Sequence, residues 1–84
     1  MAERDKHLIL VVDDQATILR IMTNMIQPQY DVCVATNGDK AIDIAASLQP
    51  DLILLDNLML GKTGIEVCEV LKAREDTDHI PIIL

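Results

Sequence analysis

Two unbroken runs of aliphatic residues, each ending in acid, stand out in the hydrophobic pattern of the chain. Residues 8–12 (Leu-Ile-Leu-Val-Val) run into Asp13 and Asp14, and residues 52–55 (Leu-Ile-Leu-Leu) run into Asp56. Continuous apolar runs of this length are typical of strands buried on both faces, as in parallel sheets covered by helices. The pattern therefore predicts two central strands of a parallel sheet.

Three further segments carry apolar residues at helical spacing, which predicts three helices. Their stripes are Ile18, Met22, Met25 and Ile26; then Ala41, Ile42, Ala45 and Leu48; then Ile65, Cys68 and Leu71. Asp14 can cap the first helix, and Pro28 ends it near Ile26. Thr63 and Glu66 have the spacing of a capping box at the start of the third helix.

Two weaker segments complete the pattern. Residues 30–34 alternate between apolar and polar, and residues 80–84 are apolar with Pro81 near the beginning, where a strand tolerates it. The resulting order, β-α-β-α-β-α-β with short connections, indicates a doubly wound α/β fold with a parallel sheet. We place the two acid-ended strands side by side, which gives the strand order 2-1-3-4. Right-handed connections then put the first helix on one face and the other two on the opposite face.

The carboxyl ends of the two central strands meet where the connections reverse direction, which is where open parallel sheets bind ligands. We expect Asp13, Asp14 and Asp56 to line that crevice. Like charges at short range repel each other unless a cation is present. Mg²⁺ prefers carboxylate oxygens together with water and phosphate, and a carboxylate can attack phosphorus to form an aspartyl phosphate. The alternative for Asp56 is a local role as a helix cap or turn residue.

Composition narrows the classes of function. The 84 residues suffice for one domain, and half of them are hydrophobic. The net charge of −7, without a Lys/Arg cluster, argues against nucleic-acid binding by this segment. The apolar runs are too short for a signal peptide or a membrane span. Cys33 and Cys68 fall inside apolar patterns, so we interpret them as small buried residues of a protein in a reducing, cytoplasmic compartment.

The ordered set of motifs resembles the receiver domain of two-component response regulators. The matching segments are residues 9–14, 50–56, 61–64 and 79–83. The resemblance implies a flavodoxin-like (CheY-like) fold in which Asp56 is the phosphoacceptor. It further implies that Asp14 ligates Mg²⁺ directly, while Asp13 acts mainly through water. The backbone carbonyl of Leu58 would complete the protein's share of the metal shell.

The function implied by the resemblance is phosphoryl acceptance in a two-component phosphorelay. The donor would be a sensor histidine kinase or a phosphotransfer protein, and the chain itself would not be a turnover enzyme. The alternative is a receiver-like interaction module that no longer switches. Asn57 and Leu60 favour it, because the family usually has an apolar residue and a proline there, and losing proline loosens the turn.

Two enzyme classes fit poorly. A hydrolase of the haloacid dehalogenase type would need a second aspartate where Leu58 stands. A dinucleotide-binding enzyme would need a glycine-rich turn after the first strand.

The family continues past the fourth strand with a Ser/Thr, a lysine-bearing fifth strand and two more helices. We therefore expect residues 1–84 to form a single, partial receiver domain in which the last α-β-α portion is absent. The fourth strand would then be an open edge, which is a template for pairing with another chain. We expect marginal stability of the isolated chain, or self-association through that edge. The alternative is that the sequence is a fragment of a longer protein.

Overall fold

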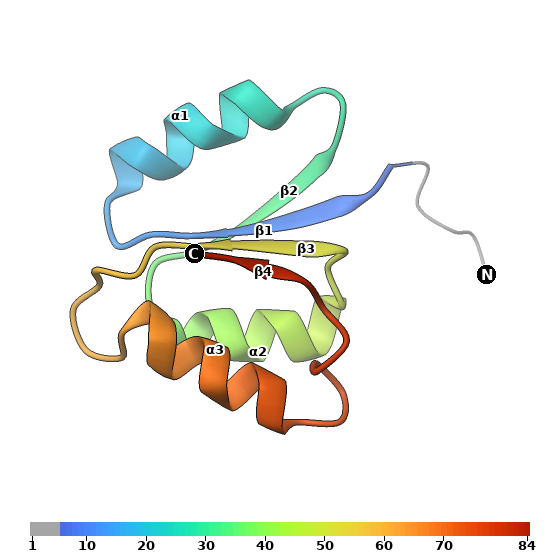
Figure 1. The fold of residues 1–84 in the computed structure, drawn as a ribbon. Coiled ribbons are helices and arrows are strands. Elements are labelled where there is room, and N and C mark those ends of the chain that lie inside the picture. Colours follow the sequence, from blue (N-terminus) through green and yellow to red (C-terminus); the bar gives the residue numbers. More distant parts are fainter. Residues whose placement is uncertain (1–5) are drawn as a thin grey trace.

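The computed structural model describes residues 6–84, in which strands and helices alternate along the chain (Figure 1). The elements are β1 (Leu8–Val12), α1 (Ala16–Ile26), β2 (Asp31–Ala35), α2 (Gly38–Leu48), β3 (Leu52–Leu55), α3 (Gly64–Ala73) and β4 (Ile82–Ile83). Each strand pairs in parallel with its neighbours, in the order β2-β1-β3-β4. The predicted fold class and strand order are therefore confirmed.

Strand β4 is shorter than the predicted 80–84. The Ile80 N–H donates to the carbonyl of Thr77 in a turn, so pairing with β3 begins only at Pro81, whose carbonyl accepts the Ile53 N–H at 3.0 Å. No helix within residues 6–84 has the length and apolar character that crossing a membrane requires.

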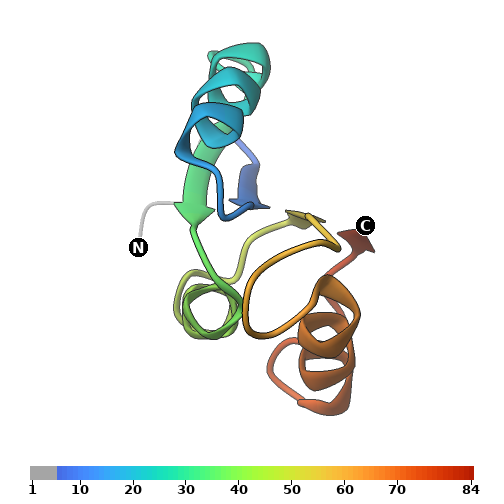
Figure 2. The same ribbon diagram turned by 90° about the vertical axis from the view of Figure 1, so that its left-hand side faces the viewer.

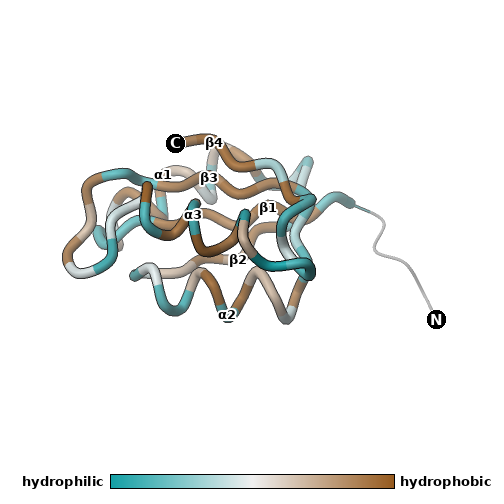
Figure 3. The backbone as a smooth tube through the Cα atoms, turned by 60° about the horizontal axis from the view of Figure 1, so that its bottom comes forward, coloured by the Kyte–Doolittle hydropathy of each residue, from teal (hydrophilic) through white to brown (hydrophobic). Residues whose placement is uncertain are grey.

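The helices form two layers around the sheet, as predicted. Helix α1 lies alone on one face, and α2 and α3 lie side by side on the other (Figures 1 and 2). The most hydrophobic stretches of the backbone follow the strands between these layers (Figure 3).

The two faces of the sheet hold cores of different size. The α2/α3 core consists of Leu10, Val12, Ala35, Ala41, Ile42, Ala45, Ile53, Leu55, Met59, Val67, Leu71 and Ile80. The α1 core consists of Ile9, Val11 and Leu19, with half-buried side chains packed around them. Successive residues of β1 thus point into opposite cores, as the alternation of a strand requires.

Strand β1 is buried on both faces, as predicted, but β3 is not. Ile53 and Leu55 are buried in the α2/α3 core, whereas Leu52 and Leu54 are half-buried. The reason is that α1 packs over β1 and β2 and leaves the same face of β3 partly uncovered. Met25 belongs to the predicted apolar stripe but is 76% exposed, so that part of the prediction was wrong: it lies beside the residues that face the sheet.

Helix α3 begins with the predicted capping box, in which the Thr63 side chain accepts from Glu66 N–H and the Glu66 side chain accepts from Thr63 N–H. Its buried stripe, however, is Gly64, Val67 and Leu71, and the predicted Ile65 is half exposed. The stripe is displaced because α3 approaches the sheet through Gly64. Cys33 and Cys68 were predicted to be buried, and they are half-buried against the α2/α3 core.

Two polar contacts fasten the connection between α3 and β4. Thr77 is fully buried, and its hydroxyl donates to the carbonyl of Leu71 at 2.7 Å. Gln49 ends α2 with φ +51°, and its side-chain amide donates to Asp76 O at 2.8 Å. The end of α2 is thereby tied to the segment that leads into β4.

Candidate metal centre

Asp13, Asp14 and Asp56 converge at one edge of the sheet, as predicted. Val12 stands opposite Leu55 in the β1–β3 ladder, so the residues that follow leave the same edge. The Asp56 N–H continues the ladder by donating to Val12 O at 3.0 Å. One carboxylate oxygen from each of the three aspartates lies within 4.8 Å of the other two.

Asp13 is the most enclosed of the three acids, with 8% of its surface exposed. Its Oδ1 accepts the Gln15 N–H at 2.9 Å, in the connection between β1 and α1. Gln15 occupies the N-cap position of α1 and makes no side-chain capping bond. The prediction that Asp14 caps this helix was therefore wrong, because the helix begins one residue too late for it.

Asp14 is exposed and accepts a hydrogen bond from the opposite side of the crevice. The donor is the main-chain N–H of Leu60, which lies 3.2 Å from Asp14 Oδ2. Sequence reasoning missed this contact, because a main-chain donor has no side-chain signature.

Asp56 is half-buried, and its Oδ1 accepts the Leu58 N–H at 3.2 Å. This is the local turn bond typical of aspartate, so the turn role considered for Asp56 exists beside its place in the cluster. Helix α3 is capped by Thr63, so Asp56 is not a helix cap.

Residues 57–63, which we call the acceptor loop, are braced at several points. The Gly64 N–H donates to Asn57 O at 3.2 Å and closes the loop at its base. Met59 is buried in the α2/α3 core. Lys62 Nζ lies 3.6 Å from Asp39 Oδ1, which joins the loop to the start of α2.

Gly64 lets α3 pack directly against the backbone of Asp56. A Cβ atom at this position would lie 2.6 Å from Asp56 O and 2.7 Å from Asn57 Cα, too close for any side chain. Sequence reasoning did not identify Gly64 as a site residue. The available signal was a glycine directly after a capping residue, which can mark a close backbone approach.

The cluster carries three acidic side chains, and the hydrogen bonds to them come from main-chain N–H groups. Its hydrogen-bond partners named above are main-chain N–H groups of Gln15, Leu58 and Leu60. Within residues 6–84, no Lys or Arg side chain forms an ion pair with any of the three carboxylates. Several carboxylate oxygens without a cationic partner form a donor set that fits a hard divalent cation.

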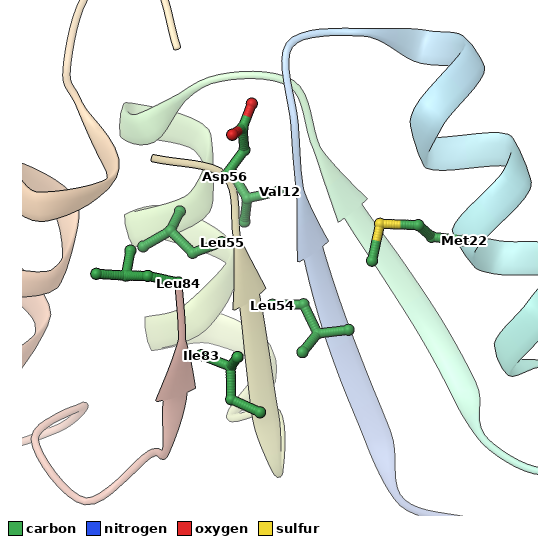
Figure 4. A pocket seen from close by; sticks show the side chains of 7 residues that line it. All are labelled: Val12, Met22, Leu54, Leu55, Asp56, Ile83 and Leu84. Atoms are coloured by element: carbon green, nitrogen blue, oxygen red, sulfur yellow. The ribbon is translucent and has the colours of Figure 1, made fainter. Parts of the chain in front are cut away.

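An apolar hollow of about 220 Å³ lies beside the cluster. Its lining residues are Val12, Met22, Leu54, Leu55, Asp56, Ile83 and Leu84 (Figure 4). The Asp56 side chain extends past the end of β3, away from Leu54 and Ile83, so its carboxylate stands at the rim. The hollow corresponds to the part of the sheet that α1 leaves uncovered.

The chain is similar in sequence to known proteins. The family pattern of the response regulator receiver domain matches residues 9–84. The response regulator PleD of Caulobacter vibrioides is 42% identical over 77 residues, which are 90% of this chain and 17% of PleD. The protein named histidine kinase P4 of Formosa agariphila is 32% identical over 84 residues, which are all of this chain and 6% of that protein. The chain thus spans less than a fifth of either relative.

The fold has solved counterparts. The N-terminal domain of a response regulator receiver protein from Methanoculleus marisnigri superimposes with a TM-score of 0.87 at 32% identity. The superposition covers 90% of this chain and 63% of that one.

Proposed function

Because this chain belongs to the response regulator receiver family, we propose that its Asp56 accepts a phosphoryl group in the presence of Mg²⁺. Phosphoryl acceptance is the role of this family. One observation carries the assignment to Asp56: its carboxylate meets those of Asp13 and Asp14 within 4.8 Å at the rim of the sheet.

In this proposal the three aspartates have different roles toward the ion. Asp14 would ligate the ion directly, whereas Asp13, whose carboxylate already accepts the Gln15 N–H, would act mainly through water. Asp56 and the backbone carbonyl of Leu58 complete the protein ligands. When bound, the ion neutralises charge on the phosphoryl oxygens.

The reaction is an in-line transfer to a carboxylate. An Asp56 oxygen attacks phosphorus and forms an O–P bond, while the P–N bond of a phosphohistidine breaks and the imidazole keeps the electron pair. The Leu58 N–H orients the Asp56 carboxylate for this attack through its bond to Oδ1.

The proposed donor is a sensor histidine kinase or a phosphotransfer protein. The family membership supports it, as does the likeness to a segment of a protein named as a histidine kinase. The single partial receiver domain expected from the sequence stays a prediction, as does a cytoplasmic location.

Acetyl phosphate with Mg²⁺ tests the phosphoacceptor directly. We expect intact-mass spectrometry to show one added phosphoryl group on the wild type and on the control Asp43→Asn, which alters an exposed aspartate of α2. Asp56→Asn should show none. An adduct that survives Asp56→Asn would contradict the assignment. A folded wild type that binds Mg²⁺ but takes up no phosphate would favour the non-switching interaction module.

We also propose that copies of the chain associate through the β4 edge. Ile83 and Leu84 are 55% and 59% exposed at the outer strand of the sheet, where unpaired main-chain groups favour pairing. Size-exclusion chromatography with light scattering should give a mass above that of a monomer, and Ile83→Lys should lower it. A wild-type monomer at micromolar concentration would contradict this proposal.

A further inference from the structure

We propose that the main-chain N–H of Leu60 is a positioning group of the metal centre. It holds the Asp14 carboxylate toward the ion and thereby couples the acceptor loop to ion binding. The inference rests on the proposed Mg²⁺ site and adds to it a residue that is not a ligand.

The contact joins two distant parts of the chain. Leu60 N–H and Asp14 Oδ2 are 3.2 Å apart across the crevice. The Leu60 side chain is 86% exposed, so its packing does not hold the loop in place. What position 60 supplies to the site is therefore its N–H, which every residue except proline carries.

Among the three acids, Asp14 depends most on such a contact. Asp13 is buried, and its carboxylate accepts the N–H of Gln15, two residues further along the chain. Asp56 directly follows β3, and its carboxylate accepts the N–H of Leu58, again two residues further along. Asp14 is exposed, and the bond that fixes its carboxylate comes from the other side of the crevice.

The bond to Leu60 is compatible with ion binding. An ionised carboxylate offers about four acceptor positions, so Asp14 can accept the N–H and ligate a cation together. Donors of this kind orient ligating carboxylates, and their loss typically weakens metal affinity by roughly 10–100-fold.

The acceptor loop is suited to present this N–H. The hydrogen bond from the Gly64 N–H to Asn57 O closes the base of the loop, and Met59 anchors the loop in the α2/α3 core. Lys62 forms an ion pair with Asp39. Coupling is reciprocal in binding equilibria, so an ion that is favoured by this contact also strengthens it. Ion binding should therefore slow hydrogen exchange at the Leu60 amide.

Three variants of the full chain separate the N–H from the side chain. Leu60→Pro deletes the N–H but also replaces the side chain and fixes φ, whereas an amide-to-ester replacement at residue 60, made by chemical synthesis, deletes the N–H and keeps the leucine side chain. Leu60→Ala keeps the N–H and is the matched control. By titration calorimetry we expect Leu60→Ala to bind Mg²⁺ within about twofold of the wild type, and the ester to bind about tenfold more weakly.

The outcomes are distinguishable. Equal Mg²⁺ affinity of the ester and Leu60→Ala would overturn the inference, and so would faster exchange of the Leu60 amide on adding Mg²⁺, because the ion would then displace the N–H. If Leu60→Pro fails to fold, the ester decides. A folded wild type that binds no Mg²⁺ would instead remove the proposed metal site itself, and the inference with it.

Discussion

The two halves of the acidic site stand on parts of the molecule that differ in how firmly they are packed. On the Asp56 side, α3 presses against the backbone through Gly64, and Met59 anchors the acceptor loop in the larger core. On the Asp13–Asp14 side, the chain enters α1, which buries Leu19 alone. The difference is one of packing: the proposed phosphoacceptor Asp56 stands next to the larger core, whereas Asp13 and Asp14 lead into a helix with little buried surface.

The largest expected effect is a loss of stability when one buried leucine from each core is replaced by alanine. Leu71→Ala should lower the free energy of unfolding by about 3–4 kcal/mol, because Leu71 is fully enclosed and its cavity cannot collapse. Leu19→Ala should cost about 2 kcal/mol, since its half-buried neighbours can move into the space. Urea denaturation followed by circular dichroism measures both. Equal losses would remove the distinction between the two faces.

The second comparison separates crowding from backbone conformation within the acceptor half. Gly64→Ala should cost about 1–3 kcal/mol, because the new methyl group meets the backbone of Asp56 and Asn57. Gly61→Ala should cost about 1–2 kcal/mol, because φ is +80° there but the surrounding space is open. Only Gly64→Ala should also slow phosphorylation by acetyl phosphate, since it displaces Asp56. Slower phosphorylation in both variants would show that the conformation of the loop, and not crowding at Gly64, determines the position of Asp56.

The third comparison concerns the starts of the helices on the two halves. Thr63→Ala removes half of the capping box of α3 and should cost about 1 kcal/mol. Gln15→Ser offers α1 a side-chain cap that it lacks and should add about 0.5–1 kcal/mol. Thermal unfolding of the two variants beside the wild type should shift in opposite directions. A destabilised Gln15→Ser would indicate that its turn with Asp13 is already optimal.

The smallest effect is the pH dependence of the capping box. The Thr63 main-chain N–H, and then its hydroxyl, hold the pKa of the Glu66 carboxyl below its ordinary value of 4.5. A lowered folded-state pKa means that the stabilisation is full above 4.5 and is lost as the pH falls through the folded-state value. The stability difference between wild type and Glu66→Gln, measured from pH 6 downward, should therefore shrink in acid. A constant difference would contradict this contribution.

The strand order could be predicted from the sequence because it depends on two long, unbroken aliphatic segments. Two aliphatic runs ending in acid sufficed to order the sheet, and parallel pairing then obliged Asp13, Asp14 and Asp56 to share an edge. Shorter signals were less reliable. The buried stripe of a helix can lie one position away from the one that the apolar spacing suggests, and for this reason the predicted stripes included Met25 and Ile65, although both are exposed.

The contacts that could not be predicted are those made by the backbone. Leu60 was expected to loosen its turn for lack of a proline ring, yet the N–H that proline lacks is the group that reaches Asp14. Residues 74–79 have no apolar pattern, yet they contain the fully buried Thr77, whose hydroxyl donates to the carbonyl of Leu71. Both depend on where a carbonyl or an amide lies after folding, which side-chain patterns do not specify.

The position of β1 between β2 and β3 has a consequence for the order of assembly. Strand β2 follows β1 after one helix, whereas β3 follows only after two. The entropic cost of closing a loop rises with its length, so the pairing of β1 with β2 should form at lower cost than that of β1 with β3. Only the second pairing brings Asp56 to the aspartates that follow β1. The mutual repulsion of the three acids therefore arises only with the second pairing, together with the burial of Ile53 and Leu55 in the α2/α3 core that opposes it.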